Sequence, residues 1–420
     1  MVSKAEYDER LPFVFHTHTG SPTGYAQSAW ILARAFWEAG LEVRYLFIGD
    51  DPLYEPESPD PLVNSLRSNQ PDLGLPQIVY SVAPLFWHNS GAYKVGWTMM
   101  EVDGVNAQWV YACNAMDEVW VPTLWQARFF AESGVVVPIY VVPLGVDERM
   151  FSPTVYPARV LGSGRDEVGK GPGRETFRFL GVGWWQLRKR WDILVRAFLD
   201  EFKDDDNVEL VIKCHTAETE CEVLATLANM LEGRELTRVK VMAQSLNWWH
   251  LAGVYRACQA FVLPTAGEGY GYPFLEALCC GLPVIATDGL GTGEILRGDD
   301  GDVYPGVGLI PARREPTGVD HPYYAGRNWW AVNESDVRRA MRDVYENYPE
   351  WKAAALQGSE QARRERSCHV AAWEVRQHLN RIYQEYGPFP REYKLRRPIG
   401  FGLGCGREGR GQWNGVQTAK

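Results

Sequence analysis

Two glutamates, Glu268 and Glu276, stand eight residues apart in a glycine-rich part of the chain and could hold the hydroxyl groups of a ligand. A carboxylate accepts hydrogen bonds with both oxygens, so it can bind vicinal hydroxyls, and two carboxylates can hold two sugar rings. Glu268 is flanked by glycines, which let a backbone approach a ligand closely. The segment 289–293 offers backbone N–H groups to a phosphate. The same residues also fit a solvated helix glutamate beside an ordinary turn, because surface glutamates are common.

The residues around this pair predict two consecutive strand–loop–helix units. An apolar strand is expected at 260–263, and a helix is expected to begin near Pro273 and to stop at Gly281. Residues 282–286 predict the next strand, and the sequence DGLGTGE at 288–294 predicts a second glycine-rich loop. Because the carboxyl ends of parallel strands share one edge of a sheet, both loops and both carboxylates are expected where open α/β sheets bind nucleotides.

The run that starts at Glu268, E-GYGYPFL-E-ALCCGLPVIAT, resembles the E-x7-E signature of retaining glycosyltransferases with the GT-B fold, the group 1 or family four class. The match combines residue types, spacing and the following strand, so it is more specific than a lone glycine motif. The resemblance implies that Glu268 contacts the sugar of a nucleotide-sugar donor and that Glu276 contacts its ribose. It also implies a diphosphate site made of glycine-rich backbone, at Gly24, Gly291, Thr292 and Gly293.

Cations are expected near the donor phosphates, because the leaving diphosphate gains negative charge as the sugar bond breaks. Members of the resembled class commonly have Gly-Arg at the start of one loop and Lys-Gly several residues later. Here Trp184 stands at the arginine position, and Lys189 aligns with the lysine. Arg188 or Arg190 is the candidate replacement for the missing guanidinium, and Lys213, at the end of the next strand, is a further candidate. The alternative is a solvated basic helix start, but cations there oppose the helix dipole unless an anion binds.

Two carboxylates, Glu101 and Asp103, follow an expected strand at 93–99. Many members of the resembled class have an active-site histidine at this place, so the chain departs from that pattern. Two interpretations stay open. The carboxylates bind the acceptor hydroxyl or the donor sugar, or Asp103 caps the helix expected at 105–116.

Strand and helix patterns alternate along the chain and predict two doubly wound, Rossmann-like α/β domains that face each other across a cleft. Residues 50–77 predict a long loop, and residues 298–324 predict mostly loop with a short strand near 307–310. The expected order is an acceptor-side domain at 1–150, a linker or flexible loop at 151–175, a nucleotide-sugar-binding domain at 176–366, a helix at 367–387 that crosses back to the first domain, and a basic, glycine-rich tail at 388–420.

The composition is that of an ordinary globular protein, since 45% of the residues are hydrophobic and 23% are charged. The net charge of −10 argues against nucleic acid as a partner, although a local basic patch could still contact a membrane surface. The first residues are polar and acidic, and no apolar run approaches the roughly 20 residues that a membrane helix needs. These features predict a cytoplasmic protein.

No metal or other cofactor is expected. Eight cysteines are scattered without C-x-x-C spacing, which indicates reduced thiols rather than disulfides or zinc. His16 and His18 could bind a metal, but no third ligand is evident, so we expect one strand-end histidine and one that lines the cleft.

Together these observations predict a hexosyltransferase that moves a sugar from a nucleotide-diphosphate sugar, linked to UDP or GDP, to a hydroxyl of a glycan, lipid or small-molecule acceptor. Retention of anomeric configuration and independence of metal ions are implied by the resemblance. Two alternatives stay open: a sugar-nucleotide epimerase with the same fold, and a nucleotide-sugar-binding scaffold that has lost catalysis. The missing arginine at Trp184 favours the scaffold, and the presence of Lys189 with both glutamates opposes it.

Overall fold

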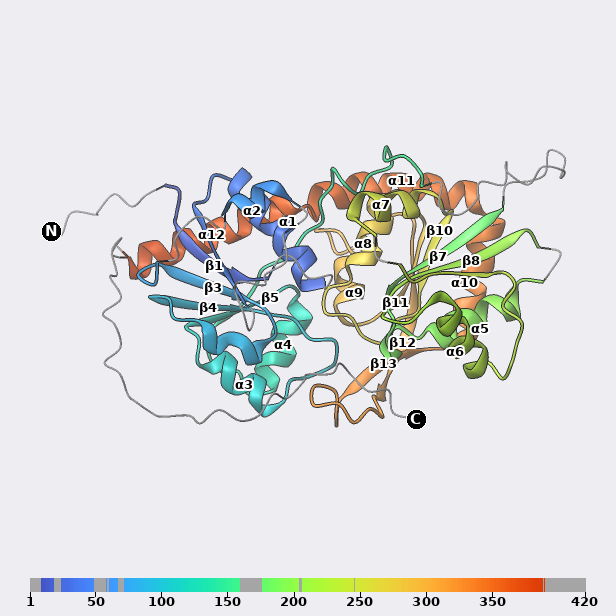
Figure 1. The fold of residues 1–420 in the computed structure, drawn as a ribbon, viewed down its shortest axis with the longest axis horizontal. Coiled ribbons are helices and arrows are strands. Elements are labelled where there is room, and N and C mark those ends of the chain that lie inside the picture. The colour runs from blue at the N-terminus through green and yellow to red at the C-terminus, as the bar shows by residue number, and fades with distance from the viewer. Residues whose placement is uncertain are drawn as a thin grey trace.

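The computed structural model describes residues 9–18, 24–48, 58, 60–66, 72–158, 176–203, 206–244, 246–387 and 389. These residues form two α/β domains that lie side by side (Figure 1). Each domain is built on a largely parallel sheet whose strands are joined through helices, so the predicted fold class is confirmed. Most of the predicted linker and nearly all of the predicted tail, at 159–175 and beyond residue 389, lie outside the described residues.

The N-terminal domain has a parallel sheet in the order β2-β1-β3-β4-β5-β6. Strands β1 and β3 are buried at every position, as expected for central strands of a sheet that is covered on both faces. The strands are β1 (Phe13–Thr17), β2 (Val43–Phe47), β3 (Pro76–Tyr80), β4 (Tyr93–Trp97), β5 (Glu118–Val121) and β6 (Ile139–Val141). The helices are α1 (Gly24–Glu38), α2 (Pro61–Leu66), the 3-10 helix η2 (Ala83–His88), α3 (Ala107–Asn114) and α4 (Leu124–Glu132).

The C-terminal domain has a sheet in the order β13-β12-β11-β10-β7-β8-β9, in which only the β12–β13 pair is antiparallel among the described pairs. Its strands are β7 (Phe177–Trp184), β8 (Val208–His215), β9 (Val239–Met242), β10 (Ala260–Leu263), β11 (Val284–Asp288), β12 (Val307–Pro316) and β13 (Asn328–Val332). Its helices are the 3-10 helix η4 (Leu187–Lys189), α5 (Trp191–Glu201), α6 (Glu220–Met230), α7 (Trp248–Arg256), α8 (Tyr272–Cys279), α9 (Leu290–Ile295), α10 (Glu334–Glu346) and α11 (Tyr348–Glu365).

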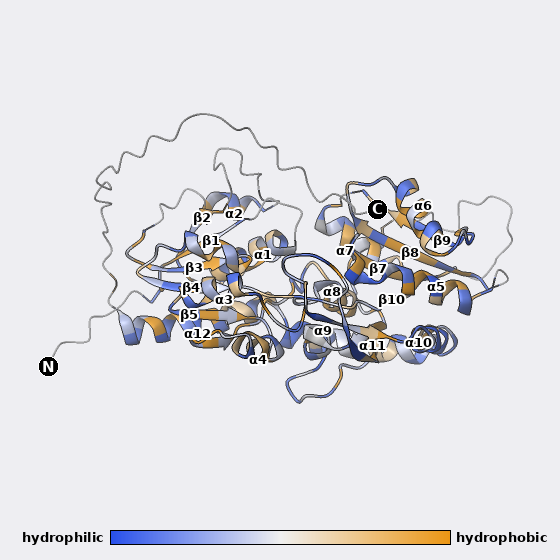
Figure 2. Cartoon of the chain, turned by 90° about the horizontal axis from the view of Figure 1, so that it is seen from below, coloured by the Kyte–Doolittle hydropathy of each residue, from blue (hydrophilic) through white to orange (hydrophobic). Residues whose placement is uncertain are grey.

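Buried apolar side chains fill the space between each sheet and its helices. In Figure 2 the central strands of both sheets are mainly orange, whereas blue is concentrated on the outer turns of the helices. Strand β10 and helix α8 are buried along almost their whole length. Residues 260–279, which carry both signature glutamates, therefore lie at the centre of the second domain.

Helix starts show where local sequence chemistry decides an element boundary. Thr219 and Glu222 form a capping box at the start of α6, in which each side chain accepts the backbone N–H of the other residue. Asn106 caps α3 by accepting the N–H of Trp109 at 3.0 Å. The interpretation of Asp103 as the cap of this helix is therefore wrong, because the helix begins at Ala107 and Asn106 directly precedes it.

The chain crosses between the two domains twice, near Val146 and near Ser367, and the two crossing segments meet at a place that we call the hinge. Val146 and Ser367 form a parallel bridge, and a side chain at Gly145 would collide with the carbonyl of Ser367. Helix α12 (Cys368–Tyr386) then runs along the N-terminal domain and packs on α1 (Figure 1). Its Arg381 forms an ion pair of 2.6 Å with the fully buried Glu118 of β5. The second domain therefore ends in a helix that is part of the first domain's core.

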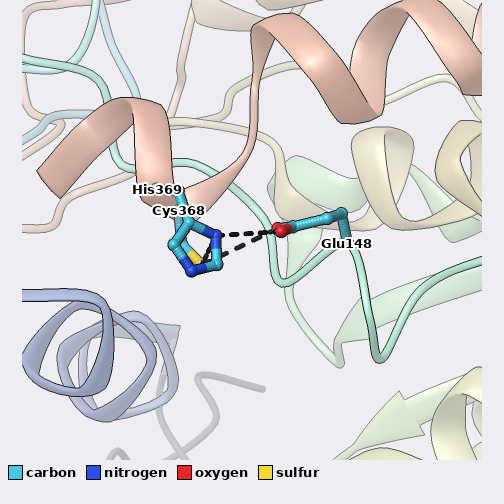
Figure 3. Close-up of side chains that lie close together, drawn as sticks. All are labelled: Glu148, Cys368 and His369. Carbon is cyan, nitrogen blue, oxygen red and sulfur yellow. Dashed lines mark hydrogen bonds and ion pairs between the residues drawn. The ribbon is translucent and has the colours of Figure 1, made fainter. Parts of the chain in front are cut away.

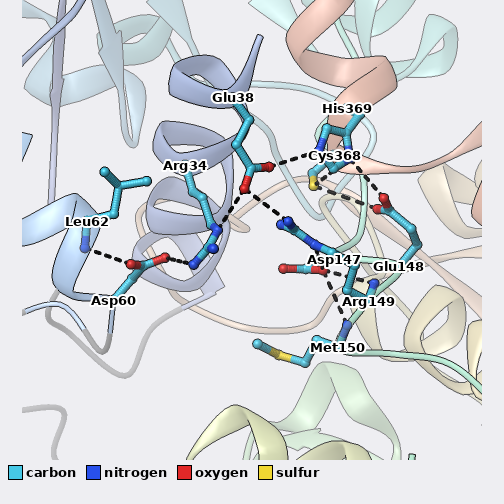
Figure 4. A network of polar contacts seen from close by, with 10 residues as sticks. All are labelled: Arg34, Glu38, Asp60, Leu62, Asp147, Glu148, Arg149, Met150, Cys368 and His369. Atoms are coloured by element: carbon cyan, nitrogen blue, oxygen red, sulfur yellow. Dashed lines mark hydrogen bonds and ion pairs between the residues drawn. The ribbon is translucent and has the colours of Figure 1, made fainter. Parts of the chain in front are cut away.

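Charged side chains surround the hinge. Glu38 of α1 accepts hydrogen bonds from Arg34 and Arg149 and faces His369 of α12 (Figure 4). Burial alone would raise the pKa of Glu38, but these partners reverse the shift and lower the pKa to about 2. Glu38 is therefore ionised and ties the first helix to both crossing segments.

Three elements differ from the sequence predictions. The expected loop at 50–77 contains helix α2, which Asp60 opens by accepting the N–H of Leu62. The expected short strand near 307–310 is the start of a long strand, which pairs with β13 in a hairpin. The expected glycine-rich loop at 288–294 is largely the helix α9.

Candidate active site

A cavity of about 660 Å³ lies between the two domains. Its N-terminal wall comes from α1, the residues after β3 and the residues after β4. Its C-terminal wall comes from the carboxyl ends of β7, β8 and β10 and from the starts of α7 and α8. This is the edge at which both sheets were expected to present their loops. A separate hollow of about 470 Å³ lies between α4 and α9.

The centre of the cavity is a cluster of three charged side chains. Lys189 Nζ lies 2.5 Å from one Glu268 oxygen, and Arg188 Nη1 lies 3.2 Å from the other. Burial alone would raise the pKa of Glu268, but the two cations reverse this and hold it below its ordinary value. Burial lowers the pKa of Lys189, and the Glu268 carboxylate opposes that shift. The predicted residues Lys189, Arg188 and Glu268 are thus brought together in one cavity.

The backbone places this cluster through contacts that the sequence pattern does not show. The N–H of Ala266 donates to the carbonyl of Arg188 at 2.6 Å, so the loop after β10 is tied to η4. Thr265 Oγ1 donates to the same carbonyl at 3.1 Å. Arg190 follows in a left-handed conformation, with φ of 54°, and separates η4 from α5. Lys189 and Arg188 therefore point into the cavity and are not the first turn of a solvated helix.

The second glutamate of the signature, Glu276, lies on α8 and is 2% exposed. Its Oε1 accepts a hydrogen bond from Gln27 of the N-terminal domain at 2.9 Å, and its Oε2 accepts one from Tyr255 of α7 at 2.7 Å. Burial raises the pKa of Glu276 to about 7, although both hydrogen bonds oppose the shift. Gln27 and Tyr255 were not predicted; Gln27 lies one turn after Gly24, which is the only local hint.

The glycine loop that borders the cavity is Gly269, Tyr270 and Gly271, at the start of α8. Gly271 has a φ of +98°, which a residue with a side chain rarely adopts. Gln126 of the N-terminal domain donates to the carbonyl of Gly269. This turn therefore stands at the start of a helix and borders the cavity, a place where backbone N–H groups can receive a phosphate.

The predicted phosphate residues Gly291, Thr292 and Gly293 are not among the described residues that line this cavity. They lie in α9, behind the glycine loop: a side chain at Gly291 would lie 3.1 Å from the Gly269 carbonyl, and Thr292 is fully buried. Gly293 borders the separate hollow beside α4. The segment 289–293 closes into a helix instead of staying open as a loop, and the phosphate role of these three residues stays a prediction.

The N-terminal wall contributes Gly24 and Glu101. Gly24 is the first residue of α1, and a side chain there would meet open space. Glu101 lies 3.5 Å from Arg188 Nη2 and accepts a long hydrogen bond of 3.4 Å from Tyr324. A side chain at Gly267 would collide with the carbonyl of Glu101, so the two domains touch here backbone to backbone. Glu101 is thus part of the predicted site.

Asp103 lies outside the cavity lining that the structure describes. Both of its carboxylate oxygens accept hydrogen bonds of 2.8 Å from Asn328, one from the backbone N–H and one from the side-chain amide. It therefore fastens the start of β13 to the N-terminal domain and takes neither of the two roles weighed from the sequence.

The other two candidate cations, Arg190 and Lys213, lie in different surroundings. Arg190 pairs with Asp192 at 3.3 Å and is not among the described residues that line the cavity. Of the two candidates for the guanidinium missing at Trp184, Arg188 is therefore the one that reaches the cavity. The ring of Trp184 meets that of His215 edge to face at the cavity wall. Lys213 also lines the cavity. Its ammonium group donates to the carbonyl of Cys214 at 2.9 Å, and burial lowers the pKa of Lys213.

The two histidines considered as metal ligands, His16 and His18, are not among the described residues that line the cavity. His16 Nδ1 bonds to the Gln77 amide at 2.6 Å and Nε2 faces the Phe47 carbonyl at 3.2 Å, so this ring is a hydrogen-bonded strand-end histidine. Burial and His88 lower the pKa of His16 to about 4.

One group at the hinge has the composition of a metal site among the described residues: Glu148, Cys368 and His369 (Figure 3). Both ring nitrogens of His369 already face carboxylate oxygens at 2.9 Å, one of Glu148 and one of Glu38. The thiol of Cys368 is buried at the start of α12, where the helix dipole disfavours a cation, and burial raises its pKa well above the ordinary value. These residues serve the hinge rather than the cavity.

Within the described part of the chain, every helix is too short or too polar to span a bilayer. The seven cysteines of that part are free thiols.

Residues 174–315, which include Lys189 and both signature glutamates, match the family model described as glycosyl transferases group 1. This region is a group 1 glycosyltransferase domain. The family recognised from the glutamate spacing is thereby confirmed. Curated relatives of the group 1 domain include D-inositol 3-phosphate glycosyltransferase of Kineococcus radiotolerans, which is 28% identical over 234 residues, 49% of this chain and 52% of that protein. A putative glycosyltransferase 45 of Sulfolobus islandicus filamentous virus is 24% identical over 56% of this chain and 62% of its own length. The chain spans about half the length of the first of these relatives.

Solved structures share the two-domain architecture of this chain. HepE from Anabaena, solved with UDP and glucose, aligns with 88% of this chain and 99% of its own, with a TM-score of 0.63 and 13% identity. Sucrose-phosphate synthase from Thermosynechococcus elongatus aligns with 89% of this chain and 99% of its own, with a TM-score of 0.64 and 15% identity. At these identities the likeness establishes the GT-B fold.

Proposed function

We propose that this protein transfers a hexose from a nucleotide-diphosphate sugar to an acceptor hydroxyl with retention of anomeric configuration. The observation that carries the proposal is the Lys189–Glu268–Arg188 cluster, which lies between the two domains in the same cavity as Glu276. A paired carboxylate at this place can hold sugar hydroxyls, and the two cations can stabilise the charge that develops on a departing diphosphate.

Each donor part has a matching element. The Glu268 carboxylate is assigned to hydroxyls of the donor sugar, and Glu276 to the ribose, where hydroxyls can use the remaining lone pairs of its oxygens. The turn Gly269–Gly271 offers backbone N–H groups to the diphosphate. Lys189 and Arg188 lie beside it. In the reaction the bond between the anomeric carbon and the phosphate oxygen breaks, the acceptor oxygen bonds to that carbon, and the acceptor proton passes to the departing diphosphate.

The position of Arg188 supports catalysis over the scaffold alternative, which the missing arginine at Trp184 favoured. Arg188 brings a guanidinium to the same cavity from a position four residues later. Because two protein cations already face the leaving group, we propose that turnover does not need a metal ion and survives a chelator.

The donor can be identified by a thermal-shift screen of nucleoside diphosphates and their sugars, because a ligand that binds only the folded state raises the Tm. UDP-linked sugars are a sensible starting point and GDP-linked sugars the comparison. The donor that raises Tm is then incubated with acceptors, and the product anomer is read by NMR. We expect donor cleavage and retained configuration. Binding without any cleavage would support the scaffold alternative, and epimerisation of free donor would support the epimerase.

A further inference from the structure

The β12–β13 hairpin of the C-terminal domain reaches across to the N-terminal domain. Its connection, residues 317–327, is closed by the N–H of Thr317 donating to the carbonyl of Arg327 at 3.0 Å. Asn106 of the N-terminal domain donates to the Pro322 carbonyl at 2.9 Å, and Tyr323 packs edge to face on Trp109. With the bonds between Asp103 and Asn328, these contacts fix the connection at the cavity.

This connection brings an aromatic wall to the cavity. His321, Tyr323 and Tyr324 all line it, and the rings of His321 and Tyr324 are stacked with centroids 4.8 Å apart. Tyr324 Oη reaches Glu101, which in turn reaches Arg188. The wall is therefore linked through Glu101 and Arg188 to Glu268, the group assigned to the donor sugar. An acceptor that approaches the donor sugar from the side of Glu101 meets this wall.

Charge is distributed unevenly around the cavity. Its cations, Arg188, Lys189 and Lys213, all belong to the C-terminal wall. On the N-terminal wall and the hairpin, the ionised group among the described lining residues is Glu101. His321 Nδ1 accepts the N–H of Tyr323 at 3.2 Å. The acceptor side thus presents aromatic surface and one carboxylate, and neither lysine nor arginine belongs to its described lining.

We propose that the acceptor of this enzyme is a neutral saccharide, whose ring lies on the Tyr323–Tyr324 wall and whose hydroxyls bond to Glu101, and is not a phosphorylated sugar. The inference rests on the proposed transfer function. Aromatic faces and a hydroxyl-accepting carboxylate fit a polyol ring. A phosphate monoester carries about −1.5 to −2 charges at pH 7 and would be repelled by Glu101, whose neighbouring cation in the described lining, Arg188, is already paired with Glu101 and Glu268. The relatives named for D-inositol 3-phosphate would then differ from this chain in acceptor class.

The direct test compares acceptors on the wild-type chain with a donor that it cleaves. Methyl hexosides and free inositols are set against hexose 6-phosphates and inositol phosphates, and nucleoside diphosphate release above acceptor-free hydrolysis is measured. The inference predicts that kcat/KM of the best neutral saccharide exceeds that of its phosphorylated counterpart at least about 100-fold. Equal or better use of phosphorylated acceptors would overturn it, and so would the absence of any stimulation by neutral saccharides.

Variants locate the effect. Tyr323→Ala and Tyr324→Ala should each raise acceptor KM about tenfold, through the loss of an aromatic contact, and should raise donor KM less. Tyr324→Phe keeps the ring and gives a smaller rise, which preserves the test if an alanine variant does not fold. Tyr111→Ala, at an exposed tyrosine of α3, is the matched control. Glu101→Gln should improve use of phosphorylated acceptors relative to wild type about tenfold.

The two hypotheses fail separately. A chain that neither binds nor cleaves a nucleotide sugar refutes the transfer function. A chain that cleaves donors but keeps a wild-type acceptor KM in Tyr323→Ala refutes the acceptor assignment alone.

Discussion

The buried Glu276 makes stability depend on pH in a way that can be calculated. Its pKa is raised from 4.5 to about 7, so the folded protein binds this proton more tightly than the unfolded chain does. A raised pKa means that the stabilising effect is fully present below pH 4.5 and is lost as the pH rises through 7. Between these values the folded state holds one more proton, and stability falls by 1.36 kcal/mol per pH unit. Over about 2.5 pH units the loss is about 3 kcal/mol.

The assay compares wild type with Glu276→Gln by urea unfolding from pH 4.5 to pH 8.5. Glutamine has no charge to bury, so the free energy of unfolding of the variant should improve relative to wild type by about 3 kcal/mol across this range. Taking the difference cancels other groups that titrate in both proteins. A difference that stays constant with pH would refute the burial argument. The nucleotide affinity of the wild type should rise with pH over the same range, because the ionised form of Glu276, which alkaline pH favours, binds the ribose hydroxyls.

Three further changes follow from the site and the hinge. Gly271→Ala places a side chain at φ +98° and should lower the free energy of unfolding by about 1–2 kcal/mol and weaken nucleotide binding at least about tenfold. Gly301→Ala, also at positive φ but in open space, is the control and should lose stability without losing affinity, as measured by urea unfolding and nucleotide titration. Arg188→Ala should lower kcat at least about 100-fold, whereas Arg190→Ala should leave it near wild type, and equal effects would remove Arg188 from the leaving-group role. Because the folded pKa of Glu38 is about 2, its stabilisation is present above pH 4.5 and is lost as the pH falls towards 2; Glu38→Gln should therefore lower Tm at pH 7 by several degrees, with the deficit shrinking on acidification.

The centre of the site could be predicted from the sequence because each of its residues lies close in sequence to the end of a strand. Glu268 and Lys189 each follow a strand by a few residues, and parallel strands bring such positions to one edge. The same argument could not find Gln27, which reaches Glu276 from 249 residues away, or Tyr255 on α7. Apart from Gly24, which lies one turn before Gln27, nothing in the neighbouring sequence distinguishes these two residues from ordinary helix positions.

The errors occur where contacts distant in sequence override a local pattern. Residues 289–293 are glycine-rich after a strand, which is the pattern of an open loop, but they close into α9. Glu294 then caps α4 of the other domain by accepting the N–H groups of Leu124 and Trp125, a contact 169 to 170 residues away in sequence. Asp103 stands where a helix cap would, yet its partner is Asn328. In both cases a long-range bond decided the role of a carboxylate.

The β12–β13 hairpin is a feature that the local sequence pattern does not predict. The run RREP in the second half of β12 is charged and mostly exposed, which suppresses the alternating apolar signal of a strand. Pairing with Trp329 and Trp330 in β13 nevertheless extends it. The hairpin belongs to one domain and is held by the other, so its course follows from tertiary contacts that no window of sequence contains.

The measurement that tests the whole account most directly is donor cleavage by Glu268→Gln, with the donor found by thermal shift. The substitution keeps the shape of the side chain but removes the charge that faces Lys189 and Arg188. The account predicts a fall in kcat of at least about 1000-fold, while the free nucleoside diphosphate still raises the Tm. Wild-type turnover by this variant would contradict the assignment of the cluster as the catalytic centre.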